Sequence, residues 1–222
     1  MRRGAIVAVV LLAAASAVWG QGAQLVVEDW SKTPVGQKGV PSGWKAQNWG
    51  SPSYDFEIVS EDSTRVLYMK SNGDSSTINK EIKVDCNDYQ ILQWKWKVVE
   101  LPKGADARKK ATDDEAAQIY VTFPRFPSAV RSRIIGYIWD TTAPAGSIFK
   151  SQKTGLVTYV VMRSGPADLG KWITERRNVV EDYKKIYGAE PDSPGYISIA
   201  IDSDDTTSFA ESVFGSILLR KP

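Results

Sequence analysis

Residues 91–123 (ILQWKWKVVELPKGADARKKATDDEAAQIYVTF) contain two segments in which apolar and polar side chains alternate. A two-residue period is typical of β-strands with one buried face. Two neighbouring tryptophans carry more apolar area than a two-stranded ribbon can cover, so a second layer must pack over them. The stretch therefore predicts a β-sandwich. The expected inward side chains are Leu92, Trp94, Trp96 and Val98 in the first strand and Ala117, Ile119, Val121 and Phe123 in the second.

Short β-rich runs separated by turn residues continue on both sides of this stretch, which is typical of antiparallel sandwiches and jelly rolls. We therefore expect an all-β, antiparallel jelly-roll sandwich. About two hundred residues suffice for one sizeable core, so residues 21–222 are predicted to form a single domain. One short helix is expected at residues 179–187, because Asn178 can cap its first turn and Gly188 can end it.

Two segments are predicted to be loops. The charged residues 102–114 between the organising strands offer little to bury, so we expect a solvated excursion. A Gly- and Pro-rich region that ends near Pro52 carries Trp44 and Trp49, and these two side chains are expected to pin the loop to the sandwich.

The first twenty residues have the parts of a secretory signal: Arg2 and Arg3, an apolar core from Ala5 to Ala17, and small residues before Gln21. We predict that residues 1–20 are a signal peptide and that the chain is periplasmic or secreted, with no membrane span after cleavage. The apolar core is short for a membrane span, and an uncleaved anchor is the alternative.

Charge and composition exclude several classes of function. The chain has 28 Lys and Arg against 26 Asp and Glu, and without Arg2 and Arg3 the two signs balance. A nucleic-acid partner is not expected, because binding to a polyanion needs clustered positive charge. The chain contains no histidine, so imidazole catalysis and histidine-bound zinc lose their usual group. Cys86 is the only cysteine, which rules out an internal disulfide.

Three polar groupings supply most of the candidate ligand-binding residues. Two of them also have a structural interpretation: a surface ion-pair network for the second grouping, and a solvated turn whose aspartates cap backbone amides for the third. The groupings are Asp113 and Asp114 with Glu115, then Glu175, Arg177 and Asp182, and then Asp202 and Asp204 with Asp205 and Thr206.

Aromatic residues add two candidates. Trp94 and Trp96 are expected in the core, whereas Trp139, beside Asp140 at the end of a strand, offers a stacking surface for a sugar ring. Tyr137 on the same strand completes the ligand-binding set.

The acidic turn at Asp202–Thr206 raises the question of a cation. Carboxylates at alternate positions suit calcium, but the turn lacks the glycine and the distal bidentate glutamate of a full calcium loop. We therefore expect no cofactor, and we expect Arg177 rather than calcium to neutralise the turn.

Motifs over nearly the whole mature chain support a family resemblance. They are LQWKWKV at 92–98, Asp113–Asp114, YIW at 137–139, Ser164–Gly165, Trp172 with Glu175, RNV at 177–179, Asp182–Tyr183, Gly188, DSDDT at 202–206 and Gly215. In combination they resemble the exported bacterial family known as domain of unknown function 3047. The pattern is also similar, as an architectural analogy, to galactose-binding-like jelly rolls, which include many carbohydrate-binding modules.

The chain departs from the family pattern at four positions. Gln118 stands where an arginine is common, Asp205 and Thr207 replace an asparagine and a glycine, and Ser216 replaces an aspartate. If the family site binds an anion through that arginine, the resemblance implies weak or absent anion binding here.

The favoured hypothesis is a non-catalytic exported binding module for a carbohydrate or a similar polar ligand. Two alternatives belong to other classes. One is an enzyme that acts on envelope polysaccharide through Glu175, Asp182 or Asp114, and the other is an envelope scaffold that binds a protein.

Overall fold

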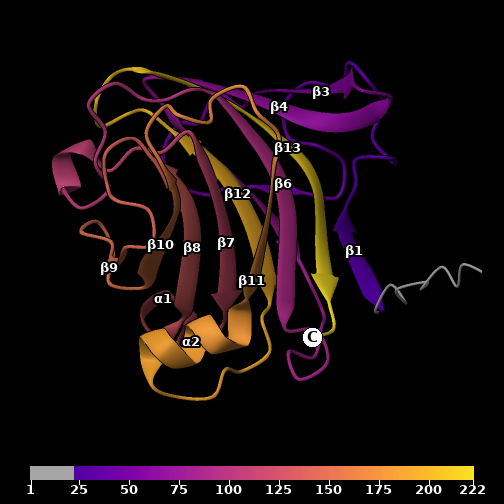
Figure 1. Cartoon of the computed structure of the whole chain (residues 1–222), viewed down its shortest axis with the longest axis vertical. Coiled ribbons are helices and arrows are strands. Elements are labelled where there is room, and N and C mark those ends of the chain that lie inside the picture. The colour runs from indigo at the N-terminus through magenta and orange to yellow at the C-terminus, as the bar shows by residue number, and fades with distance from the viewer. Residues whose placement is uncertain (1–22) are drawn as a thin grey trace, which may run out of the picture.

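A computed structural model describes residues 23–222, and these residues form two β-sheets packed face to face (Figure 1). The predicted signal peptide at residues 1–20 lies outside the described residues. Sheet A has the strand order β11-β6-β13-β4-β3, with β1 also paired to β13, and sheet B has the order β2-β5-β12-β7-β8-β10-β9. The strands are β1 (Gln24–Glu28), β2 (Lys45–Ala46), β3 (Asp55–Glu61), β4 (Thr64–Asn72), β5 (Ser75–Glu81), β6 (Ile91–Glu100), β7 (Ala117–Phe123), β8 (Arg133–Asp140), β9 (Ile148–Lys150), β10 (Val157–Ser164), β11 (Ile173–Asn178), β12 (Tyr196–Asp202) and β13 (Phe209–Arg220).

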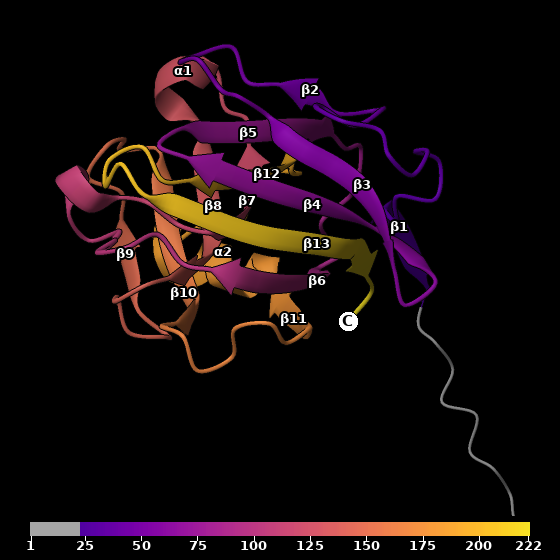
Figure 2. The same cartoon turned by 90° about the horizontal axis from the view of Figure 1, so that it is seen from above.

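The predicted all-β antiparallel sandwich is confirmed, with one parallel pairing. Figure 2 shows β3, β4, β13 and β6 side by side in one layer. The strand pairs are antiparallel apart from β8 and β10, which run parallel. Because parallel neighbours need a long crossover, the chain passes from β8 to β10 through residues 141–156, which contain β9.

The two strands of the organising stretch lie in opposite sheets and supply much of the core. Trp94 and Trp96 on β6 are fully buried, as expected. Trp94 packs against Tyr137 with ring centroids 5.3 Å apart, and Trp96 packs against Trp139 at 6.1 Å. Both partners belong to β8 of sheet B, which is the second layer that the tryptophans required.

Helix α2 (Val179–Tyr187) has the bounds predicted from the sequence. The Asn178 side chain accepts hydrogen bonds from the backbone N–H groups of Val180 and Glu181, both at 3.1 Å. Gly188 ends the helix in the left-handed region at φ 64°. Figure 1 shows α2 across one end of the sandwich. Two further short elements are a 3₁₀ turn (Lys110–Thr112) and the one-turn helix α1 (Ser128–Arg131).

The prediction of a solvated excursion at residues 102–114 is wrong. Ala105, Asp106 and Ala107 are buried, and the Ala107 N–H donates to Asp140 Oδ2 at 2.9 Å. Ala107 packs with Ile138 in a second apolar cluster on the outer side of β8. Small side chains allow the charged segment to lie against the sheet while its lysines and arginine point outward.

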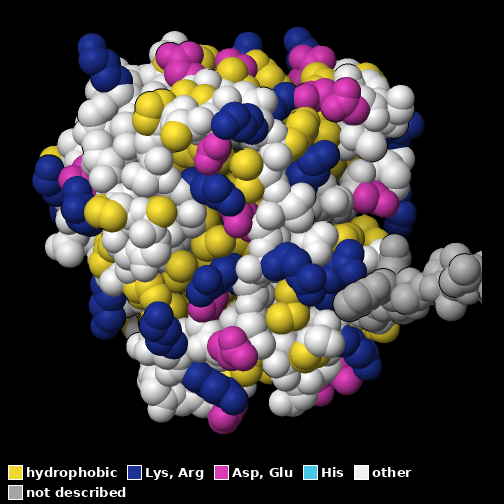
Figure 3. Space-filling model, viewed as in Figure 1, with side chains coloured by type: hydrophobic (Ala, Val, Ile, Leu, Met, Phe, Trp, Pro, Cys, Tyr) yellow, Lys and Arg dark blue, Asp and Glu magenta, His cyan; other side chains and the backbone are white. Residues whose placement is uncertain are grey.

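The surface agrees with the balanced charge of the sequence. On the face in Figure 3, basic and acidic side chains are interspersed over the molecule. Within residues 23–222, no helix has the length and apolar character needed to cross a membrane.

Candidate functional site

A groove of 870 Å³ lies over the outer face of sheet B. Successive side chains of a strand point to opposite faces of the sheet. In β5, β12 and β7 the residues between the core positions therefore point away from the sandwich, and they form the floor of the groove. The loop that carries Trp49 borders the groove beyond β5, and residues 151–157 border it on the side of β10. The floor side chains are Thr77 and Asn79 of β5, Ser198 of β12, and Gln118, Tyr120 and Thr122 of β7.

Two tyrosine rings on this face lean toward each other across a glycine on the strand between them. Gly136 of β8 pairs with Tyr120 of β7 on one side and with Tyr159 of β10 on the other. A Cβ atom at Gly136 would lie 2.7 Å from Tyr120 Cε1 and 3.0 Å from Tyr159 Cδ1. The missing side chain thus provides the space over which both rings lie.

Trp49 stands at the edge of the groove and 56% of its side chain is exposed. Its loop is fixed by Gln47, which donates from Nε2 to the Trp49 carbonyl at 2.9 Å and accepts from the Thr77 N–H at 2.6 Å. Trp44 is buried, with its Nε1 donating to Glu28 Oε2 at 2.9 Å. The prediction that both tryptophans pin the loop therefore holds for Trp44, whereas Trp49 offers its surface to the groove.

Amide and hydroxyl groups complete the floor. The Ser198 hydroxyl donates to Asn79 Oδ1 at 2.8 Å. The amide N–H groups of Asn79 have no acceptor among the described residues. Gln118 donates from Nε2 to the Glu115 carbonyl at 3.2 Å and accepts from the Tyr120 hydroxyl. The floor therefore combines donors and acceptors that a polyhydroxylated ligand can use.

Two of the three predicted polar groupings meet at one end of this groove. Asp114 accepts hydrogen bonds from the N–H of Asp205 at 3.1 Å, the N–H of Thr206 at 2.7 Å and the Thr206 hydroxyl at 2.6 Å. These bonds hold the acidic turn against the segment that leads into β7. As a result Asp202 and Asp204 line the groove.

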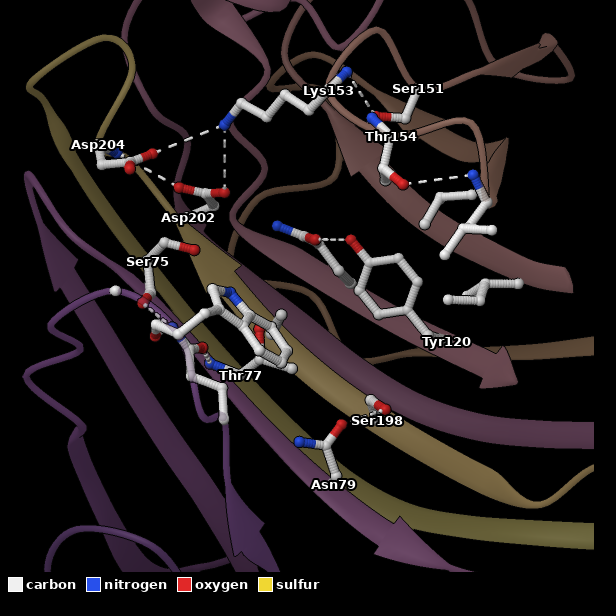
Figure 4. Close-up of a pocket in the computed structure, with 18 of the residues that line it drawn as sticks. Ser75, Thr77, Asn79, Tyr120, Ser151, Lys153, Thr154, Ser198, Asp202 and Asp204 are labelled. Atoms are coloured by element: carbon white, nitrogen blue, oxygen red, sulfur yellow. Dashed lines mark hydrogen bonds and ion pairs between the residues drawn. The ribbon is translucent and has the colours of Figure 1, made fainter. Parts of the chain in front are cut away.

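Lys153, rather than Arg177, supplies the positive charge at this acidic end, so that prediction is corrected. Its Nζ lies 2.5 Å from Asp205 Oδ2, 3.8 Å from Asp204 Oδ1 and 4.0 Å from Asp202 Oδ2. Figure 4 shows the Lys153 side chain reaching toward Asp202 and Asp204, away from Asn79 and Ser198. Arg177, near the end of β11, pairs instead with Asp182 in the first turn of α2.

Negative charge is crowded at the acidic end. Burial raises the pKa of Asp113 to about 6, although Lys153 opposes the shift. Burial, together with the Asp113 charge, raises the pKa of Glu115 well above its usual range. The pKa of Asp202 is also raised, by burial and then by Asp204. Asp113 Oδ1 and Glu115 Oε1 are buried without a hydrogen-bond partner among the described residues.

Asp114, Asp202 and Asp204 place carboxylate oxygens within 4.8 Å of one another, a spacing that a metal ion can bridge. These donors are already partly engaged. Both oxygens of Asp114 accept hydrogen bonds from the turn, and the Lys153 ammonium lies within 4.0 Å of Asp202 and Asp204. The sequence-based prediction that no cofactor is bound stays a prediction.

The remaining candidates lie outside the groove. Glu175 is buried and accepts from Arg163 Nε at 2.8 Å. Asp182 accepts from Arg177 Nε and from the Tyr137 hydroxyl, both at 2.8 Å, so this trio fastens α2 to β8 and β11. Trp139 is 1% exposed and its Nε1 donates to the Gly165 carbonyl at 3.1 Å, so its ring offers no surface for a sugar.

Sequence reasoning therefore found the acidic end of the groove and missed the floor. The polar, outward positions of β7 were recognised, but alternation alone does not show which outer face is concave. Lys153 lies in a crossover whose path depends on the parallel pairing of β8 and β10, and no local pattern marks it.

The fold and the groove define the class of this chain: an all-β sandwich with an open, polar and aromatic groove across the outer face of one sheet. Residues 42–218 match the model of the family described as protein of unknown function DUF3047. The chain belongs to this family, as the motifs of the sequence suggested. No curated protein matches the chain.

Solved structures of similar architecture are β-sandwich domains. The xylan-binding domain CBM22-1 of Paenibacillus barcinonensis Xyn10C is 11% identical with a TM-score of 0.43, covering 90% of this chain and 96% of that one. TmCBM61 in complex with β-1,4-galactotriose is 10% identical with a TM-score of 0.39, covering 87% of this chain and 99% of that one. The xylan-binding module CBM15 is 11% identical with a TM-score of 0.41, covering 90% and 97%. These likenesses concern the fold alone.

Proposed function

We propose that this chain is an exported, non-catalytic module that binds a glycan in the groove over sheet B. The observation that carries the proposal is the groove itself: an open space of 870 Å³ with an exposed indole at its edge and a floor of side-chain amides and hydroxyls. Sugars present apolar C–H faces and polar hydroxyl edges, so a site for them needs an aromatic surface beside hydrogen-bonding groups.

The aromatic part of the site is preorganised. Gln47 fixes the loop of Trp49 from both its amide ends, and Gly136 lets Tyr120 and Tyr159 lie close together in the sheet. Because these groups are positioned before the ligand arrives, little conformational entropy is lost on binding. The arrangement favours a rigid, ring-shaped ligand over a flexible peptide.

The residues that were candidates for catalysis support binding rather than cleavage. Glu175 and Asp182 do not line the groove, and an arginine holds each of them. Asp114 is buried and its oxygens bond to the turn. An envelope polysaccharide enzyme that used these carboxylates would need them beside the bound sugar.

A glycan array with the mature protein, followed by calorimetric titration of the oligosaccharides that bind, tests the proposal. We expect Trp49→Ala to weaken binding about tenfold or more, which corresponds to about 1.4 kcal/mol or more. Phe126→Ala is the matched control, since Phe126 is 90% exposed and does not line the groove. Both variants remove exposed side chains, so both should keep the melting temperature of the wild type.

A uniformly blank array, together with a melting temperature that no sugar raises, would overturn the proposal. Equal loss of binding in Trp49→Ala and Phe126→Ala would place the glycan elsewhere on the molecule. Release of shortened products from a bound polysaccharide would show that the chain is an enzyme.

A further inference from the structure

We propose that the groove selects glycans that carry free amino groups, with a sugar ammonium seated beside Asp202 and Asp204. This inference rests on the proposed function and names the chemical class of its ligand. The charged side chains that line the groove are three aspartates and one lysine. Among the described residues, no arginine lines it, so an acidic sugar finds no unpaired cation there.

The three aspartates do not contribute equally. Asp74 is engaged by neighbouring serines, since it accepts from the hydroxyl of Ser53 at 2.6 Å and that of Ser71 at 2.8 Å. Among the described residues, no hydroxyl group donates to Asp202 or Asp204, and the Asp204 side chain is 47% exposed. The uncompensated negative charge of the groove is therefore at its acidic end.

Lys153 shows that this end accommodates an ammonium group. Of the three aspartate carboxylates that its Nζ faces, only that of Asp205 is in direct contact, at 2.5 Å. The distances of 3.8 Å to Asp204 and 4.0 Å to Asp202 are longer than a charge-assisted hydrogen bond of about 2.7–2.9 Å. One ammonium thus faces three aspartates, and Asp204, whose side chain is 47% exposed and lines the groove, keeps the capacity to bind a second cation.

The surroundings of Lys153 point the same way. Its Nζ donates to the Asp113 carbonyl at 3.2 Å, and Asp113 Oδ2 accepts from the Ser151 hydroxyl at 3.3 Å. Asp113 Oδ1, which is buried beside the groove rather than in its lining, has no hydrogen-bond partner among the described residues. Because the pKa of Asp113 is about 6, its carboxylate is partly ionised at pH 6, and that charge adds to the negative potential that a bound cation experiences, since a buried charge is screened less than an exposed one.

Binding of four hexasaccharides at pH 6, where sugar amines are largely protonated, tests the inference. The probes are hexamers of β-1,4-linked glucose, glucosamine, N-acetylglucosamine and galacturonate linked α-1,4. We expect the glucosamine hexamer to bind about fivefold more tightly than the glucose hexamer at low salt, and galacturonate to bind most weakly. Added salt should reduce this preference.

Asp204→Asn should bring the ratio of the glucosamine and glucose affinities close to one. The Asp204 side chain is 47% exposed and lies 3.8 Å from Lys153 Nζ, so its replacement by asparagine is expected to leave the fold intact. Asp192→Asn is the matched control, because Asp192 is similarly exposed, pairs with Arg125 at 3.4 Å and lies outside the groove. This control should keep the preference of the wild type.

The outcomes separate this inference from the proposed function. Equal binding of the glucose and glucosamine hexamers, or a preference that survives in Asp204→Asn, overturns amine selection and leaves glycan binding intact. No binding of any glycan overturns both. A melting temperature that calcium raises in the wild type but not in Asp204→Asn would show that the acidic end is a metal site, which also overturns the inference.

Discussion

Gly136→Ala is the substitution that most directly links the packing of sheet B to the groove. The new Cβ would lie 2.7 and 2.9 Å from two carbons of the Tyr120 ring and 3.0 Å from Tyr159. Ordinary carbon contacts are about 3.5–4.0 Å, so the Tyr120 ring must move by roughly 1 Å. Tyr120 is held by Gln118, and Tyr159 packs against Phe149, which restricts this movement.

Overpacking of this kind costs about 1–3 kcal/mol, and the loss of a flexible glycine from a strand offsets roughly 0.5–1 kcal/mol of it. We expect a net destabilisation of about 1–2 kcal/mol, which lowers the melting temperature by about 2–8 °C for a domain of this size. Glycan affinity should fall as well, because the displaced Tyr120 ring lines the groove. Thermal unfolding and calorimetric titration measure the two effects.

A second substitution separates crowding from other effects. Tyr120→Leu in the Gly136→Ala background removes the crowded ring atoms and should recover much of the stability while glycan affinity stays low. Gly155→Ala is the control, because a Cβ there meets nothing within 4 Å. If Gly136→Ala were as stable as the wild type and bound glycan equally well, the described packing of the two tyrosines would be refuted.

Three further predictions concern the acidic end of the groove. Thr207 has a φ of 50°, where a β-branched residue is strained, so Thr207→Gly should raise the free energy of unfolding by about 0.5–1 kcal/mol in chemical denaturation; a loss of stability would contradict the strained turn. Lys153→Met should lower the free energy of unfolding by about 1–3 kcal/mol at pH 7. The loss should be smaller at pH 4, because protonation reduces the repulsion among the carboxylates. An equal loss at both pH values would show that the lysine does not act through its charge. The pKa of Asp113 is raised to about 6 in the folded chain, so the native state binds the extra proton and this group adds stability as pH falls from about 6 toward 4. Asp113→Asn should remove that part of the pH dependence and stabilise the protein at pH 7 by on the order of 2 kcal/mol, and an unchanged stability curve would refute the assignment.

Local patterns in the sequence were sufficient for most of the fold. Alternation around Trp94 and Trp96 predicted buried strands and a second layer, and the capping residues Asn178 and Gly188 predicted the bounds of α2. These features depend on residues that are close in the sequence, so they can be predicted without knowledge of the tertiary structure. The prediction for the charged segment 102–114 failed because the buried residues of this segment are small and form no apolar pattern in the sequence.

The site was less predictable, for a physical reason. Asp114 and the acidic turn were identified because charged residues cluster in the sequence, and their meeting depends only on the adjacency of β7 and β12. The groove floor consists of ordinary polar residues on the outward side of strands, such as Asn79 and Ser198. Their importance comes from the loops at the edges of sheet B, which border the groove above them. Trp139 was a candidate because it ends a strand, but its side chain points into the core.

A two-dimensional ¹H–¹⁵N spectrum of residues 21–222, recorded while glycans are added, tests glycan binding in the groove most directly. Each tryptophan contributes an indole N–H resonance, and Trp49 and Trp172 provide an internal comparison. Trp49 lines the groove. Trp172 lies outside the groove, near the edge of sheet A, and its Nε1 donates to Glu61 Oε1 at 2.9 Å. The account predicts that the Trp49 indole resonance moves with saturable dependence on glycan concentration while that of Trp172 stays in place. A saturable shift of Trp172 with Trp49 unmoved would contradict it.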